Sequence, residues 1–119
     1  MTLSHSEDDK KFVADQAHPL IASTPAPPYF AVIFTSIRTE GDNGYSVAAQ
    51  AALDMARQQP GFLGYESARN DVGISVSYWE SLDSIRAWKN HPLHQAVQKR
   101  ADDWYADSRI RICKVERDY

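Results

Sequence analysis

The sequence has one cysteine, Cys113, and no hydrophobic run long enough to span a membrane. A single cysteine excludes an intrachain disulfide and a cysteine-based metal cluster, and it fits a reducing cytoplasm. A membrane-spanning helix needs roughly 20 apolar residues in succession. Residues 1–9 lack a positively charged segment followed by an apolar core, so no signal peptide is expected. These absences predict a cytoplasmic protein without a membrane partner.

Basic residues are also too few and too scattered for a nucleic-acid-binding surface. Lysine and arginine number 13 against 16 aspartates and glutamates, which gives a net charge of −3. A duplex-binding face needs a concentrated basic patch, and none is visible. The 119 residues have an ordinary globular composition. We therefore expect one folded domain and no nucleic-acid partner.

Residues 1–28 differ in composition from the rest of the chain. Ser6, with Asp9 three positions later, predicts a capped helix that runs to Ala17. Prolines impose extended backbone on the following segment, at positions 19, 25, 27 and 28. We interpret residues 1–28 as an arm that lies on the body or on a partner, and residues 29–119 as the domain.

The domain alternates strand patterns with helical patterns. The predicted order is a strand at 29–38, a helix at 45–59, strands at 62–70 and 72–79, a helical region at 82–106 and a last strand at 109–116. Pro60-Gly61 ends the first helix, Ser81 caps the second, and Pro92 restarts it after His91. This β-α-β-β-α-β order predicts a ferredoxin-like α+β fold, a four-stranded antiparallel sheet with helices on one face.

Apolar side chains occur on both faces of this predicted sheet. In the first strand Phe30 and Phe34 point one way while Ala31 and Ile33 point the other. In the third strand Ile74, Val76 and Tyr78 share one face. One layer of helices covers only one side, so a second copy packed sheet against sheet is the favoured cover. The alternative is that the arm covers this face.

The other face of the third strand carries Ser75, Ser77 and Trp79. Small polar side chains beneath helices fill space poorly, so they predict a cavity between the helices and the sheet. The alternative is that both hydroxyls bond to backbone or water and that no void exists.

Four segments carry a family resemblance, in the order Tyr29-Phe-Ala-Val-Ile-Phe-Thr-Ser, Gln59-Pro-Gly-Phe-Leu-Gly-Tyr-Glu-Ser, Gly73-Ile-Ser-Val-Ser-Tyr-Trp-Glu-Ser and Trp88-Lys-Asn-His-Pro-Leu-His. Over residues 29–118 the chain resembles the antibiotic biosynthesis monooxygenase (ABM) domain family of dimeric α+β barrels. The resemblance implies a homodimer with a ligand cleft between sheet and helices in each subunit.

The resemblance also implies candidate site positions. Quinone-forming members oxidise polycyclic phenols with O₂ and no cofactor, using an Asn and a Trp on the third strand and a Tyr on the next helix. Here the Trp is Trp79, the Asn position is Ser75 and the Tyr position is Ile85. Haem-degrading members use an Asn, a Trp and a haem-ligating His, and these positions are Phe34, Trp88 and Gln98. Glutamine is not a usual haem ligand, so haem degradation is disfavoured.

Histidines are the candidate bases for deprotonating a phenol near neutral pH. His94 follows Trp88 on the second helical region, and the alternative for it is a solvated or half-buried helical histidine. For His91 a helix cap before Pro92 is favoured over a base. The two histidines lie one helical turn apart without a matched third ligand, so no metal site is predicted.

Our functional prediction is a cytoplasmic monooxygenase that acts on a small phenol or hydroquinone-like compound with O₂ and without a cofactor. The predicted catalytic residues are His94 and Trp79. The predicted substrate-binding residues are Phe34, Ser75, Ser77, Trp88 and Tyr105. For Trp88 and Tyr105 the alternatives are a core residue and an anchor of a helix end. The alternative function is a non-catalytic ligand-binding or stress-related dimer that uses the same cleft.

Overall fold

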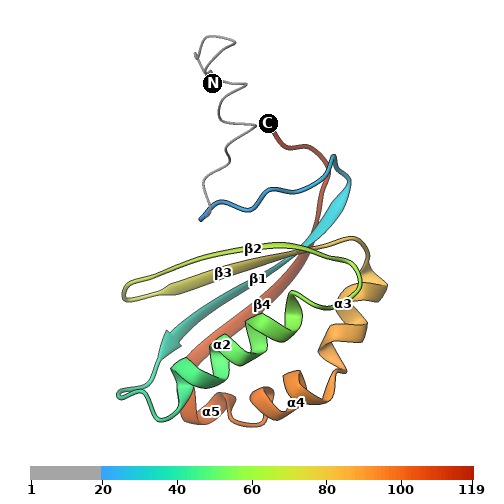
Figure 1. The fold of residues 1–119 in the computed structure, drawn as a ribbon. Coiled ribbons are helices and arrows are strands. Elements are labelled where there is room, and N and C mark those ends of the chain that lie inside the picture. Colours follow the sequence, from blue (N-terminus) through green and yellow to red (C-terminus); the bar gives the residue numbers. More distant parts are fainter. Residues whose placement is uncertain (1–19) are drawn as a thin grey trace.

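A four-stranded antiparallel sheet carries all of the helices on one face in the computed structural model, which describes residues 20–119 (Figure 1). The elements are β1 (Tyr29–Arg38), α2 (Tyr45–Ala56), β2 (Phe62–Arg69), β3 (Gly73–Trp79), α3 (Leu82–Lys89), α4 (Pro92–Gln98), α5 (Ala101–Trp104) and β4 (Tyr105–Val115). The strand order β2-β3-β1-β4 confirms the predicted ferredoxin-like fold. The helix predicted at 6–17 lies outside the described residues.

The boundary between the last helix and the last strand was predicted wrongly. The helical pattern was expected to reach Ala106, but α5 ends at Trp104 and β4 begins at Tyr105. The Trp104 carbonyl accepts from Arg38 Nε at 2.8 Å and from the backbone N–H of Thr39 at 3.0 Å. These bonds to the end of β1 hold the chain where it turns into the sheet, so tertiary contacts override the helical periodicity.

The register assigns a face to each strand residue, because residues opposite one another in an antiparallel pair share a face. On the helix side, the pairs between β1 and β3 are Phe30 with Trp79, Val32 with Ser77 and Phe34 with Ser75. On the other side, which we call the outer face, they are Ala31 with Tyr78, Ile33 with Val76 and Thr35 with Ile74. The predicted facing of the first and third strands is therefore confirmed.

The core lies between the helices and one end of the sheet. Its buried residues are Ala56 of α2, Trp79 of β3, and Ile85 and Trp88 of α3. Trp104 anchors the opposite end, where its indole N–H donates to the Asn43 carbonyl at 3.0 Å.

None of the helices in the described part of the chain combines the length and the apolar character needed to cross a membrane.

The segment at residues 20–28 runs over the outer face (Figure 1). The Ala22 N–H donates to Glu66 Oε2 at 2.9 Å, and a Cβ built at Gly64 would lie 3.0 Å from the Ala22 Cβ. This segment covers only part of the face, because Ile37 and Ile74 remain 45% and 47% exposed. Residues 20–28, the described part of the arm, therefore cover one end of the outer face, as the alternative raised by the sequence proposes for the arm.

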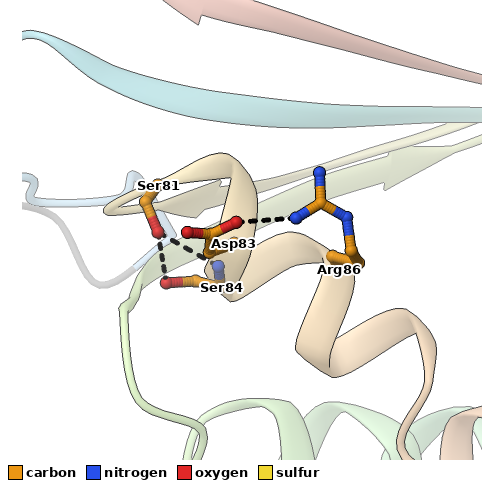
Figure 2. Close-up of polar contacts among 4 residues, drawn as sticks. All are labelled: Ser81, Asp83, Ser84 and Arg86. Atoms are coloured by element: carbon orange, nitrogen blue, oxygen red, sulfur yellow. Dashed lines mark hydrogen bonds and ion pairs between the residues drawn. The ribbon is translucent and has the colours of Figure 1, made fainter.

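Helix α3 begins with a side-chain cap, as predicted. Ser81 Oγ accepts from the backbone N–H of Ser84 at 3.0 Å, and Asp83 pairs with Arg86 at 2.6 Å on the exposed side (Figure 2). Gly61 has a φ of 85°, and a Cβ there would lie 2.1 Å from Ser84 Oγ. The Pro60-Gly61 turn therefore leaves the space that the start of α3 occupies.

We expect Ser81→Ala to lower the free energy of unfolding by about 1 kcal/mol, because it removes the acceptor for the Ser84 N–H. Urea denaturation followed by circular dichroism measures this change. Arg86→Gln is the control and should change stability by less than about 0.5 kcal/mol, because the pair it breaks is exposed. Equal effects of the two substitutions would contradict the capping role.

Candidate functional site

A cavity of about 550 Å³ lies between the sheet and the helices. This volume is within the range of small-molecule sites, and most of the lining is apolar or aromatic. All of the residues predicted to form the site line it, namely Phe34, Ser75, Ser77, Trp79, Trp88, His94 and Tyr105. The small side chains of β3 therefore leave a void, as the sequence indicated.

Trp79 forms a wall of the cavity and is almost fully covered. Only 1% of Trp79 is exposed. The Phe62 ring packs edge-on against it, with ring centroids 5.4 Å apart. The indole N–H donates to Ser77 Oγ at 2.8 Å, so this donor is engaged within the protein.

His94 lies flat against Trp88. Their rings are stacked 4.7 Å apart with an interplanar angle of 9°. His94 Nδ1 lies 3.1 Å from the Trp88 carbonyl oxygen, and a carbonyl only accepts, so Nδ1 carries the hydrogen. Nε2 then holds a lone pair, and no partner for it occurs among residues 20–119.

Burial lowers the pKa of His94 from its ordinary value of 6.5, because removal from water disfavours the charged imidazolium. The bond to the Trp88 carbonyl opposes this shift, and the nearby His91 adds to it. At neutral pH the His94 side chain is therefore an uncharged imidazole with a basic nitrogen. This is the protonation state that a general base requires.

His91 has the role that the sequence favoured for it, that of a helix cap. Its Nδ1 accepts from the Leu93 N–H at 3.1 Å, which caps α4 before Pro92. Its ring lies tilted against Trp88 at 5.2 Å. His91 is thus a capping residue that also supports the Trp88 ring.

The serines of β3 supply hydroxyl groups to the cavity. Ser77 Oγ accepts from Trp79, so its own O–H remains a donor. The Ser75 hydroxyl has no partner among the described residues. Both serines line the cavity, and their hydroxyls can hydrogen-bond to a ligand there.

A cluster of aromatic rings lines the opposite end of the cavity from Trp79. The Tyr105 ring packs edge-on against Phe34 at 5.1 Å and against Tyr45 at 5.6 Å. The Tyr105 hydroxyl donates to the Tyr45 hydroxyl at 3.2 Å. Burial, and then this bond, raise the pKa of Tyr105, so its hydroxyl stays protonated.

Arg69 is a cavity residue that the sequence analysis missed. Its guanidinium donates to the Ser36 carbonyl at 3.3 Å and to the Ser36 hydroxyl. The alternation of side chains along β2 could have revealed its position, because Tyr65, Ser67 and Arg69 pair with helix-side positions of β3.

Within residues 20–119, no group of three or more His, Cys, Asp or Glu side chains is placed to hold a metal ion.

Comparison with known sequences identifies a family and a relative. The sequence profile of the family described as antibiotic biosynthesis monooxygenase matches residues 28–100. The uncharacterized protein YqjZ of Bacillus subtilis is 45% identical over 100 residues, which cover 82% of this chain and 88% of that protein.

Solved structures share the fold at low sequence identity. SnoaB, a cofactor-independent oxygenase from Streptomyces nogalater, has a TM-score of 0.67 and 10% identity over 77% of this chain and 97% of its own. PA3566 from Pseudomonas aeruginosa has a TM-score of 0.64 and 12% identity over 80% of this chain and 99% of its own.

We expect the lowered pKa of His94 to make stability depend on pH. Below pH 6.5 the unfolded chain binds a proton at this position more readily than the folded protein does. Stability should therefore fall as the pH decreases from about 7.5 to about 5, and His94→Gln should reduce this fall. Thermal unfolding across this range measures the effect, and identical pH dependence in the two proteins would contradict a buried neutral His94.

Proposed function

The chain belongs to the antibiotic biosynthesis monooxygenase family, and from this premise we propose that it is a cofactor-independent monooxygenase. Its substrate is a small aromatic compound of the phenol or hydroquinone type, and its oxidant is O₂. The observation that carries this proposal is the neutral His94 imidazole at the wall of a largely apolar cavity, with an Nε2 that has no partner among residues 20–119.

The proposed reaction begins with proton transfer from the phenol to His94 Nε2. The phenolate is electron-rich, and a largely apolar cavity solvates this anion poorly and keeps it reactive toward O₂. One oxygen atom forms a new ring carbonyl and the other leaves as water. The products are a quinone and water, and the aromatic ring supplies all of the electrons. The reaction therefore balances without a further reductant.

The lining residues have distinct proposed roles. Trp88 fixes the plane of the His94 ring, Phe34 offers aromatic surface for stacking, and Trp79, which is 1% exposed, supports the cavity wall. The hydroxyls of Ser75 and Ser77 orient oxygen atoms of the substrate. Tyr105 shapes the far end of the cavity through its contacts with Phe34 and Tyr45.

A non-catalytic ligand-binding protein is the second candidate. It is supported by the engaged indole N–H of Trp79 and by the apolar Ile85 at a position where quinone-forming relatives are expected to have a tyrosine. Haem degradation has less support, because Gln98 lines the cavity at the position expected for the haem-ligating histidine.

The assembly that we propose is a cytoplasmic homodimer formed through the outer face, with residues 1–28 as an arm of the domain at 29–119. The support is the apolar surface that residues 20–28 leave uncovered around Ile37 and Ile74. Exposed apolar area of this kind is typical of an interface.

We expect His94→Gln to lower O₂ consumption with an oxidisable phenol or hydroquinone by about 10²- to 10⁴-fold, the usual contribution of a general base. An oxygen electrode measures the rate. The unsubstituted enzyme should also keep its activity somewhat below pH 6.5, because the lowered pKa keeps His94 neutral there.

The matched control is Gln95→Ala, which changes an exposed residue beside His94 on α4. Its rate should equal that of the unsubstituted enzyme. Saturable binding of phenols without any O₂ consumption would reject the oxygenase and favour the second candidate.

We expect a solution mass of about 27 kDa, twice that of the 13.4 kDa chain. Ile33→Lys places a charge in the middle of the outer face, next to Arg111 of β4, and should shift the mass toward the monomer. Val47→Lys is the control, since Val47 is 77% exposed on α2. Sedimentation measures both variants, and a monomeric unsubstituted protein would contradict the dimer.

A further inference from the structure

Within residues 20–119, the charged side chains that line the cavity are all basic. Arg69 and Lys89 line it, and no aspartate or glutamate of the described residues does. The chain as a whole carries more acidic than basic side chains, 16 against 13. The cavity therefore has a local charge opposite to that of the protein, which favours an anionic ligand.

Arg69 is an exposed residue at the rim of the cavity, and its guanidinium occupies a space that only glycine leaves. A Cβ built at Gly73 would lie 2.1 Å from both Cζ and Nη2 of Arg69. The guanidinium thus lies over the backbone of β3 and reaches Ser36 on β1, where it bonds to the carbonyl and the hydroxyl. Ser36 is 2% exposed, so the acceptor that fixes the guanidinium is itself buried.

The guanidinium keeps unused hydrogen-bonding capacity. Both of its described bonds go to neutral oxygens of Ser36, and its Nε makes none with any residue from 20 to 119. No carboxylate among residues 20–119 forms an ion pair with it. A positive charge fixed at the rim of a ligand cavity, with no carboxylate of residues 20–119 paired to it, is suited to binding the planar, two-oxygen edge of a carboxylate.

Arg69 and His94 lie toward different ends of the cavity. Ser36, which holds Arg69, pairs with Gly73 at the first residue of β3. Trp88, on which His94 stacks, packs with Trp79 at the last residue of β3. A ligand that reaches both groups has an acidic group at one end and a hydroxyl at the other.

We propose that Arg69 is a specificity-determining residue and that the cavity takes a hydroxylated aromatic carboxylate. The carboxylate binds Arg69 and the phenolic hydroxyl faces His94. This assignment rests on the proposed function for the fate of the hydroxyl, while the binding of the carboxylate can be measured without turnover.

Calorimetric titration in the absence of O₂ tests the proposal. The probes are a hydroxynaphthoate with its hydroxyl and carboxylate at opposite ends of the rings, and the methyl ester of the same compound. We expect Arg69→Gln to weaken binding of the acid by about 10- to 100-fold and of the ester by less than about 3-fold. The control Arg57→Gln removes an exposed arginine outside the cavity and should change neither affinity.

Gly73→Ala provides a second test that removes no charge. The new Cβ would occupy the position of the guanidinium, so Arg69 must move away from Ser36. We expect this variant to lose affinity for the acid and to retain affinity for the ester, as Arg69→Gln does. Circular dichroism establishes that each variant is folded.

The proposal is overturned if the unsubstituted protein binds neither probe, or if it does not bind the acid more tightly than the ester. It is also overturned if Arg69→Gln weakens the binding of both probes equally. The proposed oxygenase fails differently. In that case the acid binds in an Arg69-dependent manner, but admission of O₂ leads to no oxygen consumption. The same protein samples therefore distinguish failure of one proposal from failure of the other.

Discussion

Large aromatic side chains at the two ends of the helix–sheet interface, with small side chains between them, are the constraint on which the site depends. Trp79 and Trp88 pack at one end, and Trp104 and Tyr45 pack edge-on at the other. Between them the sheet presents serines and α2 presents alanines, such as Ala49 and Ala52. The helices rest on the bulky ends, so the middle cannot collapse and a cavity remains.

This arrangement also determines the chemistry of His94. The Trp88 ring that supports the end of the helix layer stacks on the imidazole, and the Trp88 carbonyl selects its tautomer. Burial in the same interface keeps the ring uncharged. A packing residue of the core therefore positions and tunes the group that we propose as the base, which joins stability and function in one side chain.

The two faces of the sheet differ in the residues that they carry. The helix side holds the cavity, with basic residues at its rim and aromatic residues at its walls. The outer face holds apolar residues such as Ile33 and Val76, together with the hydrogen bond from Ala22 of the segment before β1 to Glu66. Since β4 is exposed along most of both faces, the described chain leaves surface that a second copy can cover.

Much of the fold and part of the site could be predicted from the order of the residues. Alternation within the strands, the alanine-rich helix, and the caps at Ser81 and His91 are local signals, so they determined the topology and the direction in which Ser75, Ser77 and Trp79 point. The start of β4 at Tyr105 and the placement of Arg69 over Gly73 were decided only by the tertiary structure. The physical reason is that each depends on a bond or a close approach between distant segments, from Arg38 to Trp104 and from Arg69 to Ser36, and local periodicity carries no information about such contacts.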